Sequence, residues 1–300
     1  MKKHPILIVL VILGIVVIFL GMVMSVVLIF SGPSSGLLLS NKIGVITIEG
    51  TIMSSEPIVS QLVEFKQDKG IKAVILRIDS PGGGVGASQE IYREVQKTTK
   101  KKKVIVSLGG VAASGGYYIA SAGDKIVANP GTITGSIGVL MEFIQLKNLL
   151  EKIGVSLEVL KSGEYKDIGS PHRELTERDK ELIKGLITEI QEQFIHAVAR
   201  GRNISVERVR QIADGRILSG AMAKDLGLVD RLGNFQDAVD LAKKMSGIKG
   251  EASLVYPKKR SIRLWDLVFQ GFSKAFYDAI ADHLKTTVEY RWDGFFHAQD

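Results

Sequence analysis

The 300-residue sequence contains no cysteine and only five histidines. Without thiols the chain has no cysteine nucleophile, no disulfide and no cysteine-ligated metal site. The histidines do not follow a metal-binding spacing such as His-Glu-x-x-His, so we expect neither a metal ion nor another cofactor. A hydrolytic site in this chain would therefore have to use a different nucleophile.

Charged residues are absent from residues 6–30, an apolar stretch of 25 residues. A helix of this length spans a hydrocarbon core of about 30 Å, whereas the apolar part of a cleaved signal peptide has about 7–15 residues. We therefore predict a transmembrane helix over about residues 6–30. Lys2 and Lys3 precede the span and the next basic residue is Lys42, so the positive-inside rule predicts a single-pass cell-membrane protein with a cytoplasmic N-terminus. The remainder of the chain would then lie outside the cytoplasm.

Composition divides the chain into four parts. Residues 1–30 form the anchor, and residues 31–41, which begin with a Ser-, Gly- and Pro-rich stretch, form a flexible linker. Residues 42–250 alternate strand-like and helical patterns, which predicts one α/β domain of about 200 residues. Residues 251–300 form a basic tail with the spacing of an amphipathic helix.

The sequence pattern of the central domain is clear enough to predict where its strands and helices begin and end. The expected strands are residues 43–48, 73–78, 104–108, 125–128 and 156–160. The expected helices include residues 86–99, 142–153 and 176–200, the last with a capping-box-like start at residues 176–179.

Ser114 is a lone hydroxyl in a run of small residues, 111–116 (VAASGG), between a strand-like and a helix-like segment. At a helix N-terminus, unpaired backbone N–H groups and the helix dipole stabilise negative charge on a bound carbonyl oxygen. This placement suits a serine nucleophile. A serine that merely caps the helix is the alternative.

A second turn of the same kind lies at residues 79–84 (DSPGGG), again between a strand-like and a helix-like segment. Glycines let the backbone approach a ligand closely, and one N–H from each turn would supply the paired donors of an oxyanion hole. A tight turn after a strand explains the glycines equally well.

Four segments follow one another along the chain: residues 79–83 (DSPGG), 112–118 (AASGGYY), 134–139 (TGSIGV) and 163–166 (GEYK). In this order they resemble the signal peptide peptidase SppA family, bacterial membrane-bound serine proteases with a Ser/Lys dyad. The resemblance covers about residues 42–245 and implies a fold of the ClpP/crotonase superfamily. It also implies roles for five residues: Ser114 as nucleophile, Lys166 as general base, Ser136 as the residue that orients the lysine, and the N–H groups of Gly83 and Gly115 as the oxyanion hole.

The general base is the residue that the sequence pattern itself does not select. A lysine serves as a base near neutral pH only if burial or a neighbouring charge lowers its pKa from about 10.4. The residues alone do not rank Lys166 above Lys161, and His172 is a further alternative. The resemblance favours Lys166.

The resemblance implies an endopeptidase that degrades remnant signal peptides and other hydrophobic peptides. It also implies a homo-oligomer, described for single-copy members as a ring of eight, in which the serine of one subunit meets the lysine of the next. Peptides and the lipid membrane are the other expected partners. Nucleic acid is not expected despite a net charge of +7, because the domain is predicted outside the cytoplasm.

Two other functions remain open at this point. One is a crotonase-like acyl-CoA hydratase or isomerase, and the other is a catalytically silent membrane scaffold or peptide-binding protein. The amphipathic tail could lie on the membrane, pack on a neighbour or enter the peptidase groove. The sequence indicates neither the cleavage preference nor the natural substrate.

Overall fold

The computed structural model describes residues 5–30, 41–257 and 288–291, with side chains for residues 13–25 and 41–257. The chain divides into two units, Met1–Leu39 and Ser40–Asp300. In the first unit the expected N-terminal helix is present as α1, Pro5–Phe30. Counting only the described residues, no helix is long and apolar enough to cross a membrane. The transmembrane anchor therefore stays a prediction.

The second unit is built on an eight-stranded sheet with the order β10-β1-β2-β4-β5-β9, to which β6 is added beside β4 and β8 beside β6. All pairs are parallel except β6 with β8. The central strands are buried almost throughout, which a parallel sheet covered on both faces requires. The strands are β1 (Lys42–Glu49), β2 (Ile71–Ser80), β4 (Lys103–Ala113), β5 (Lys125–Ala128), β6 (Ile133–Gly135), β8 (Ile217–Ser219), β9 (Arg231–Leu232) and β10 (Ser253–Val255).

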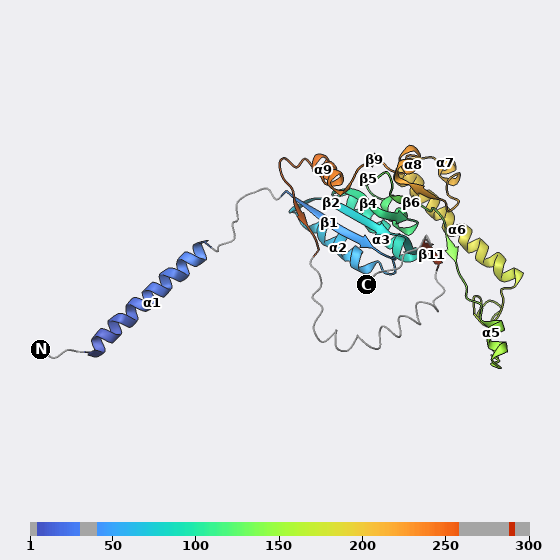
Figure 1. Cartoon of the computed structure of the whole chain (residues 1–300), viewed down its shortest axis with the longest axis horizontal. Coiled ribbons are helices and arrows are strands. Elements are labelled where there is room, and N and C mark those ends of the chain that lie inside the picture. The colour runs from blue at the N-terminus through green and yellow to red at the C-terminus, as the bar shows by residue number, and fades with distance from the viewer. Residues whose placement is uncertain (1–4, 31–40, 258–287, 292–300) are drawn as a thin grey trace. The chain divides into compact units, whose positions relative to one another are not determined.

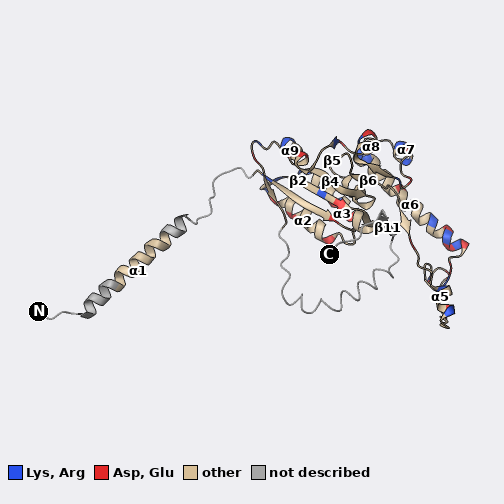
Figure 2. Ribbon diagram, viewed as in Figure 1, with Lys and Arg blue, Asp and Glu red and all other residues tan. Residues whose placement is uncertain are grey.

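Helices cover both faces of this sheet (Figure 1), so the domain has three layers. Apolar residues of α2, α3, α4 and α6 form the larger core on one face, and α9 forms a smaller core on the other. Charged residues are frequent along α6, whereas the strands carry few (Figure 2). The helices of this unit are α2 (Glu56–Gln67), α3 (Val85–Thr99), α4 (Gly115–Ala120), α5 (Lys147–Lys152), α6 (Glu177–Arg202), α7 (Val206–Arg210), α8 (Gly220–Asp225) and α9 (Phe235–Ser246).

A separate three-stranded sheet has the order β3-β11-β7. Its strands come from distant parts of the chain. They are β3 (Gly82–Gly84), β7 (Leu140–Met141) and β11 (Val288–Arg291).

Four of the five expected strands are present, within β1, β2, β4 and β5. The long expected helix is α6, and its capping box is formed as expected: Asp179 N–H donates to Thr176 Oγ1 at 3.1 Å, and Thr176 N–H donates to Asp179 Oδ2 at 3.0 Å.

Two expectations were wrong. Residues 156–160 form no strand, and the helix expected over residues 142–153 is limited to α5. Residues 155–160 are exposed, and within the described residues no strand lies beside them to complete a ladder. The linker, apart from Asn41, and the expected tail helix lie outside the described residues.

Candidate active site

Ser114 is the N-cap residue between β4 and α4, with φ 51° and ψ −116°. Its N–H donates to Gly135 O at 2.9 Å, and its carbonyl accepts from Tyr118 N–H at 2.8 Å. A sharp strand-to-helix turn of this kind places a nucleophile at the end of a sheet. The Ser114 hydroxyl is buried and has no hydrogen-bond partner among the described residues. A buried unpartnered polar group costs about 1–3 kcal/mol, so this hydroxyl calls for a functional explanation.

Small residues are required around Ser114 because α4 begins against the end of β2. A Cβ added at Gly116 would lie 3.1 Å from Ser80 O and 3.4 Å from Ile78 Cγ2. A larger residue at position 116 would therefore push the start of α4 away from the sheet. This explains part of the small-residue run that marks the turn in the sequence.

Ser136 lies next to Ser114. The parallel pairing of β4 with β6 places Ala113 opposite Gly135, so the two serines follow paired residues. Ser136 is also buried, and its φ is 49°. Among the described residues the only other non-glycine residue with positive φ is Asn203, which caps the C-terminus of α6, where this conformation is common. Backbone strain of about 1–3 kcal/mol per residue is thus concentrated at the two serines expected in the site.

The glycine turn lies beside α4. Ile52 N–H donates to Gly82 O and Gly84 N–H donates to Ile52 O, both at 2.8 Å. Gly83 has φ 154°, and a Cβ there would lie 2.3 Å from Ile52 O, so only glycine fits. Because β3 packs against α4, the structure brings Gly83 close to the helix that begins at Gly115.

Asp79 joins the two turns, a role that the sequence analysis missed. Its carboxylate accepts from Val111 N–H at 3.0 Å and from Gly110 N–H at 3.3 Å. The end of β2 is thereby fixed to the part of β4 that leads to Ser114. The signal available in the sequence was an acidic residue at the very end of an apolar strand, next to the glycine turn.

Lys166 is not brought to Ser114 within this chain. It lies exposed in the arm, which we define as residues 142–176 between β7 and α6. The arm extends away from the sheet beyond the start of α6 (Figure 1). Over residues 41–257 no hydrogen bond or ion pair involves Lys166 Nζ. The structure therefore assembles Ser114, Ser136, Gly83 and Gly115, but leaves the expected base apart from them.

The two alternative bases also lie in the arm. Lys161 Nζ is paired with Asp167 Oδ1 at 2.8 Å and donates to Glu164 O at 2.9 Å. A move of Lys161 to a serine hydroxyl would break both contacts. Over residues 41–257, Lys166 Nζ makes no hydrogen bond or ion pair that such a move would break. The ring of His172 has its Nε2 atom buried without a partner. The structure thus gives a reason to rank Lys166 above Lys161, which the residues alone did not.

The arm is fixed to the start of α6 by Arg173. This guanidinium bonds Asp167 at 2.9 Å and Asp179 at 2.5 Å. Hydrogen bonding to Arg173, and then to Lys161, holds the pKa of Asp167 well below its usual range. Arg173, followed by the backbone of Thr176, lowers the pKa of Asp179 to about 2. Both carboxylates are therefore charged at neutral pH, and through Arg173 they join Asp167 of the arm to the start of α6.

The tyrosines after Ser114 are unsuited to act as bases. Burial raises the pKa of Tyr118 to about 12 and raises the pKa of Tyr117 further. The Tyr117 hydroxyl donates to Leu228 O at 2.8 Å, and the Tyr118 ring packs against Phe194 with centroids 4.9 Å apart. Both residues secure α4 in the core.

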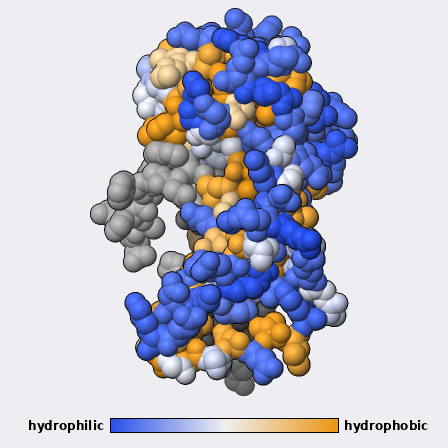
Figure 3. All heavy atoms as spheres, turned by 90° about the vertical axis from the view of Figure 1, so that its right-hand side faces the viewer, coloured by the Kyte–Doolittle hydropathy of each residue, from blue (hydrophilic) through white to orange (hydrophobic). Residues whose placement is uncertain are grey.

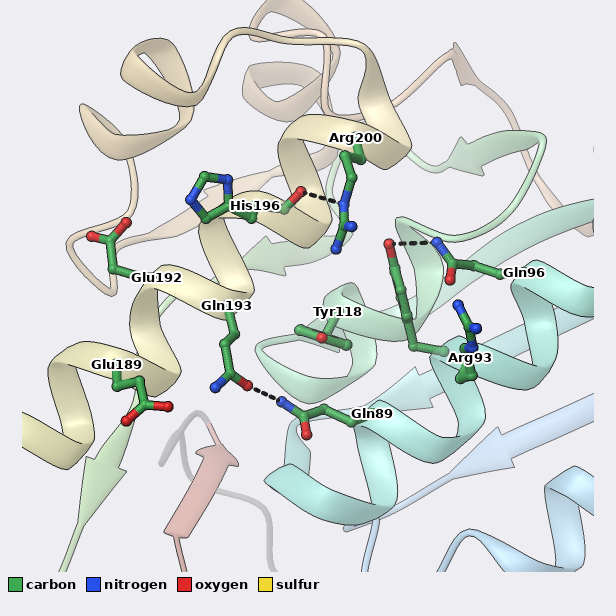
Figure 4. Close-up of a pocket in the computed structure, with 10 residues that line it drawn as sticks. Gln89, Arg93, Gln96, Tyr118, Glu189, Glu192, Gln193, His196 and Arg200 are labelled. Carbon is green, nitrogen blue, oxygen red and sulfur yellow. Dashed lines mark hydrogen bonds between the residues drawn. The ribbon is translucent and has the colours of Figure 1, made fainter.

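A hollow of about 540 Å³ lies between α3, α4 and α6 (Figure 4). Its walls include Gln89, Gln193 and Arg200, and the two glutamine amides are hydrogen-bonded across it at 2.8 Å. None of the five expected site residues lines it, so the hollow is separate from the Ser114 turn. The described residues contain no group of three or more His, Asp or Glu side chains that could hold a metal ion.

Comparison with protein families decides the class to which this site belongs. The model of Peptidase family S49 matches residues 96–249, a range that includes Ser114, Ser136 and Lys166. The chain belongs to peptidase family S49. A Clp protease model matches residues 34–132, which hold β1, β2, β4 and the Ser114 turn. This S49 domain is accordingly an α/β domain of the ClpP-like class, as expected.

Several relatives of this S49 peptidase are named as proteases. A protein of Synechocystis sp., named as a candidate protease, is 42% identical over 85% of this chain and 91% of its own length. A candidate signal peptide peptidase SppA of Enterococcus faecium is 41% identical over 62% of this chain and 54% of its own length. The chloroplastic serine protease SPPA of Arabidopsis thaliana is 34% identical over 75% of this chain and 34% of its own length. These relatives support a peptidase of the serine type and favour it over the hydratase alternative.

Proposed function

We propose that this S49 peptidase is a membrane-anchored endopeptidase with a Ser/Lys dyad, in which Ser114 is the nucleophile and Lys166 the general base. The observation that carries the proposal is the conformation and burial of Ser114. Its side chain is buried and unpartnered, its backbone is strained, and it stands at the N-terminus of α4. Ser136 lies beside Ser114 and has the same strained, positive φ. In this proposal its hydroxyl orients the amine of Lys166.

The proposed reaction is an acyl transfer to Ser114. Lys166 Nζ takes the proton from Ser114 Oγ, which attacks the scissile carbonyl carbon. The N–H groups of Gly83 and Gly115 stabilise the oxyanion of the tetrahedral intermediate. As the C–N bond breaks, Lys166 returns the proton to the leaving amine. Water, activated by the same lysine, then hydrolyses the acyl ester and restores the Ser114 hydroxyl.

The lysine that completes the site comes from a neighbouring copy of the chain. Two features support this arrangement: the arm carries Lys166 away from Ser114, and the arm is rich in exposed apolar side chains. Hydrophobic residues gather at the lower end of the face that includes the arm and α6 (Figure 3). Large exposed apolar surfaces mark interaction sites. The exposed residues are Leu149, Ile153, Val155, Leu157, Val159, Leu160, Leu182 and Leu186. We infer a closed homo-oligomeric ring, with eight copies as the size that the family resemblance implies.

The proposed substrates are hydrophobic peptides, such as the remnants of signal peptides released in the membrane. Anchoring by residues 6–30, with the domain outside the cytoplasm, would place the site at the membrane surface where such peptides emerge. The name of the Enterococcus faecium relative agrees with this substrate class.

Ser114→Ala tests the nucleophile. We expect peptide hydrolysis to fall by at least about 10⁴-fold and labelling by a fluorophosphonate probe to disappear, because only the hydroxyl is removed. Ser88→Ala is the matched control, since Ser88 in α3 also has a buried hydroxyl without a partner. Circular dichroism and the elution volume of both variants should match the wild type. Turnover above background by purified Ser114→Ala would contradict the assignment.

A further inference from the structure

Strand β4 carries more residues than its neighbour β2 shortly before it reaches Ser114. The pairs on either side of the irregular stretch are Ile78 with Leu108 and Ser80 with Ala112. Between these pairs one residue of β2, Asp79, faces three residues of β4, 109–111, which we call the bulge. Bulges are frequent beside active sites, where they redirect a side chain. At about 3.3 Å per residue, the two additional residues change the place of Ser114 along the sheet by about 7 Å.

The bulge lies where β4 exchanges one neighbouring strand for another. Before the bulge, β4 pairs with β5 as far as Ser107. From Val111, the last residue of the bulge, β4 pairs with β6, and this second pairing sets Ser114 beside Ser136. The positions of both serines relative to β2, and to the glycine turn that follows β2, therefore depend on how the bulge is held.

Two side chains bond the backbone of the bulge. Asp79 Oδ1 accepts from Val111 N–H at 3.0 Å, and Asp79 Oδ2 accepts from Gly110 N–H at 3.3 Å. The buried hydroxyl of Thr132 donates to Gly109 O at 2.7 Å. Each residue of the bulge thus has a backbone group held by a side chain, where a regular strand would use the backbone of its neighbour.

An ionised carboxylate suits this place better than any other side chain of its size. It has two acceptor oxygens and no donor, so Asp79 accepts from two neighbouring N–H groups at once. The amide of an asparagine would turn an NH2 group toward one of them. The carboxylate also lies close against the bulge, because a Cβ added at Gly109 would be 2.4 Å from Asp79 Oδ2. The backbone of Asp79 is held in turn, since its carbonyl accepts from Gly50 N–H at 3.0 Å.

We propose that Asp79 is a positioning residue of this peptidase, whose carboxylate fixes the bulge and thereby sets the distance of Ser114 from the oxyanion donor Gly83. This inference rests on the function proposed above. Gly83 follows Asp79 by four residues. Ser114 follows Val111, a bonding partner of that carboxylate, by three residues. One contact therefore joins the segment that leads to the donor with the segment that leads to the nucleophile. A displacement of about 1 Å between reacting groups lowers a rate by about 100-fold.

Asp79→Asn in the full chain tests this role, with Asp124→Asn as the matched control. Asp124 Oδ2 accepts from Val104 N–H at 2.8 Å, which is the same kind of contact near the opposite end of β4. We expect the kcat of Asp79→Asn to fall by about 10- to 100-fold with KM for the same peptide nearly unchanged, because alignment in the transition state is lost. The kcat of Asp124→Asn should stay close to that of the wild type, even if both variants melt at a lower temperature.

Two further measurements separate positioning from a general loss of structure. Labelling of Ser114 by a fluorophosphonate needs no bound peptide, and its rate in Asp79→Asn should fall in parallel with kcat. Hydrogen exchange at Gly110 and Val111 should be faster in Asp79→Asn and unchanged in Asp124→Asn. Thr132→Val removes the other side-chain contact of the bulge, and it should lower kcat by about 3- to 10-fold without raising KM.

The possible failures are distinguishable. If Asp79→Asn exchanges faster at the bulge but keeps its kcat, or if Asp124→Asn loses as much kcat, the positioning role is wrong and the proposed function stands. A higher KM with unchanged kcat would also overturn the role, since it would place Asp79 in substrate binding. If the wild type neither hydrolyses peptides nor reacts with the probe at Ser114, the proposed function is wrong and the positioning role falls with it. Should Asp79→Asn not fold, Thr132→Val decides by the same readouts.

Discussion

Ser114 holds a side chain in a backbone conformation that glycine adopts more readily. Its strain, about 1–3 kcal/mol, is stored where the hydroxyl is needed. We predict that Ser114→Gly is as inactive as Ser114→Ala but unfolds at a higher temperature. Relief of strain should exceed the 0.5–1 kcal/mol entropy cost of glycine by about 1 kcal/mol, which corresponds to roughly 2–4 °C for a domain of this size. Calorimetry of the two variants checks this. Equal melting temperatures would show that the turn is unstrained.

The base assignment is tested by three substitutions in the arm. Lys166→Met keeps most of the apolar stem and removes the amine, so we expect hydrolysis to fall by at least about 100-fold. Lys161→Met and His172→Ala should retain much of the activity, since Lys161 is already paired with Asp167. Steady-state kinetics of the three proteins with one peptide gives the comparison. If His172→Ala were the inactive variant instead, the dyad would be wrong.

The sequence predicted part of this site and missed the rest for physical reasons. Ser114 and the glycine turn at residues 79–84 were identified because small residues after an apolar run mark a tight turn, whereas Gly83 itself was named only from the family resemblance. The closeness of Ser136 to Ser114 followed only from family resemblance, since it depends on the register of β4 with β6. The preference for Lys166 over Lys161 came only from the family resemblance, and the ion pair of Lys161 with Asp167 that supports it is a contact between side chains that no pattern reveals.

At the scale of elements, the sequence predicted those strands whose apolar residues are buried on both faces. Residues 155–160 alternate apolar and polar side chains as a strand does, yet alternation forms no ladder without a neighbouring strand. The start of α6 was predictable because its capping box is local. The attachment of the arm to that start was not, since Arg173 contacts two carboxylates that stand six residues away on either side.

Arg173→Met should loosen the arm and lower activity by roughly 10- to 100-fold, because a shift of the loop by about 1 Å misplaces the lysine. Arg178→Met is the matched control. Arg178 pairs with Glu164 in the same region, but both side chains are exposed, and an exposed pair contributes little. Activity and hydrogen exchange of residues 161–173, measured for both variants at neutral pH, give the comparison. Similar losses in the two variants would contradict a special role for Arg173.

The same attachment should depend on pH. The pKa of Asp179 is lowered in the fold, so its contribution to stability is present above its unfolded value, about 3.9, and is lost as pH falls through its folded value, about 2. Hydrogen-exchange protection of the wild-type arm should therefore persist to about pH 4 and decline below it. Protection in Arg173→Met should be weaker at neutral pH, and its difference from the wild type should narrow between about pH 4 and pH 2, without closing, because Arg173 also bonds Asp167, whose pKa is held well below its usual range. A difference that stays constant over this range would exclude the carboxylate as its cause.

For the whole molecule, the α/β architecture was predictable from the sequence pattern, whereas the ClpP-like class and the relation between copies were expected only from the family resemblance. One chain shows the Ser114 turn apart from Lys166, the proposed base, which lies in an arm with an apolar surface exposed to solvent. The path of the tail was also open in the sequence, because pairing of β11 with β3 and β7 joins residues about 150–200 positions apart. Contacts between distant segments, or between copies, leave no periodic pattern of apolar residues in the sequence from which they could be predicted.

The final prediction concerns the assembly. If each site takes Ser114 from one copy and Lys166 from the next, then Ser114→Ala and Lys166→Met are each inactive alone but complement each other when mixed. After dissociation and reassembly of the domain from residue 41 onward, an interface with an intact Ser114 on one side and an intact Lys166 on the other should recover activity. For random mixing at equal amounts, one interface in four has this combination, so we expect about a quarter of the wild-type rate per site.

Subunit exchange has to be shown in the same samples, with two differently labelled copies whose energy transfer rises on mixing. The double variant Ser114→Ala/Lys166→Met, mixed with an excess of wild type, is the matched control, and it should lower activity as it enters the oligomer. If labelled copies exchange and the two single variants recover no activity, the dyad is formed within one chain. The arm would then have to fold back by a large movement, and its apolar residues would need another partner.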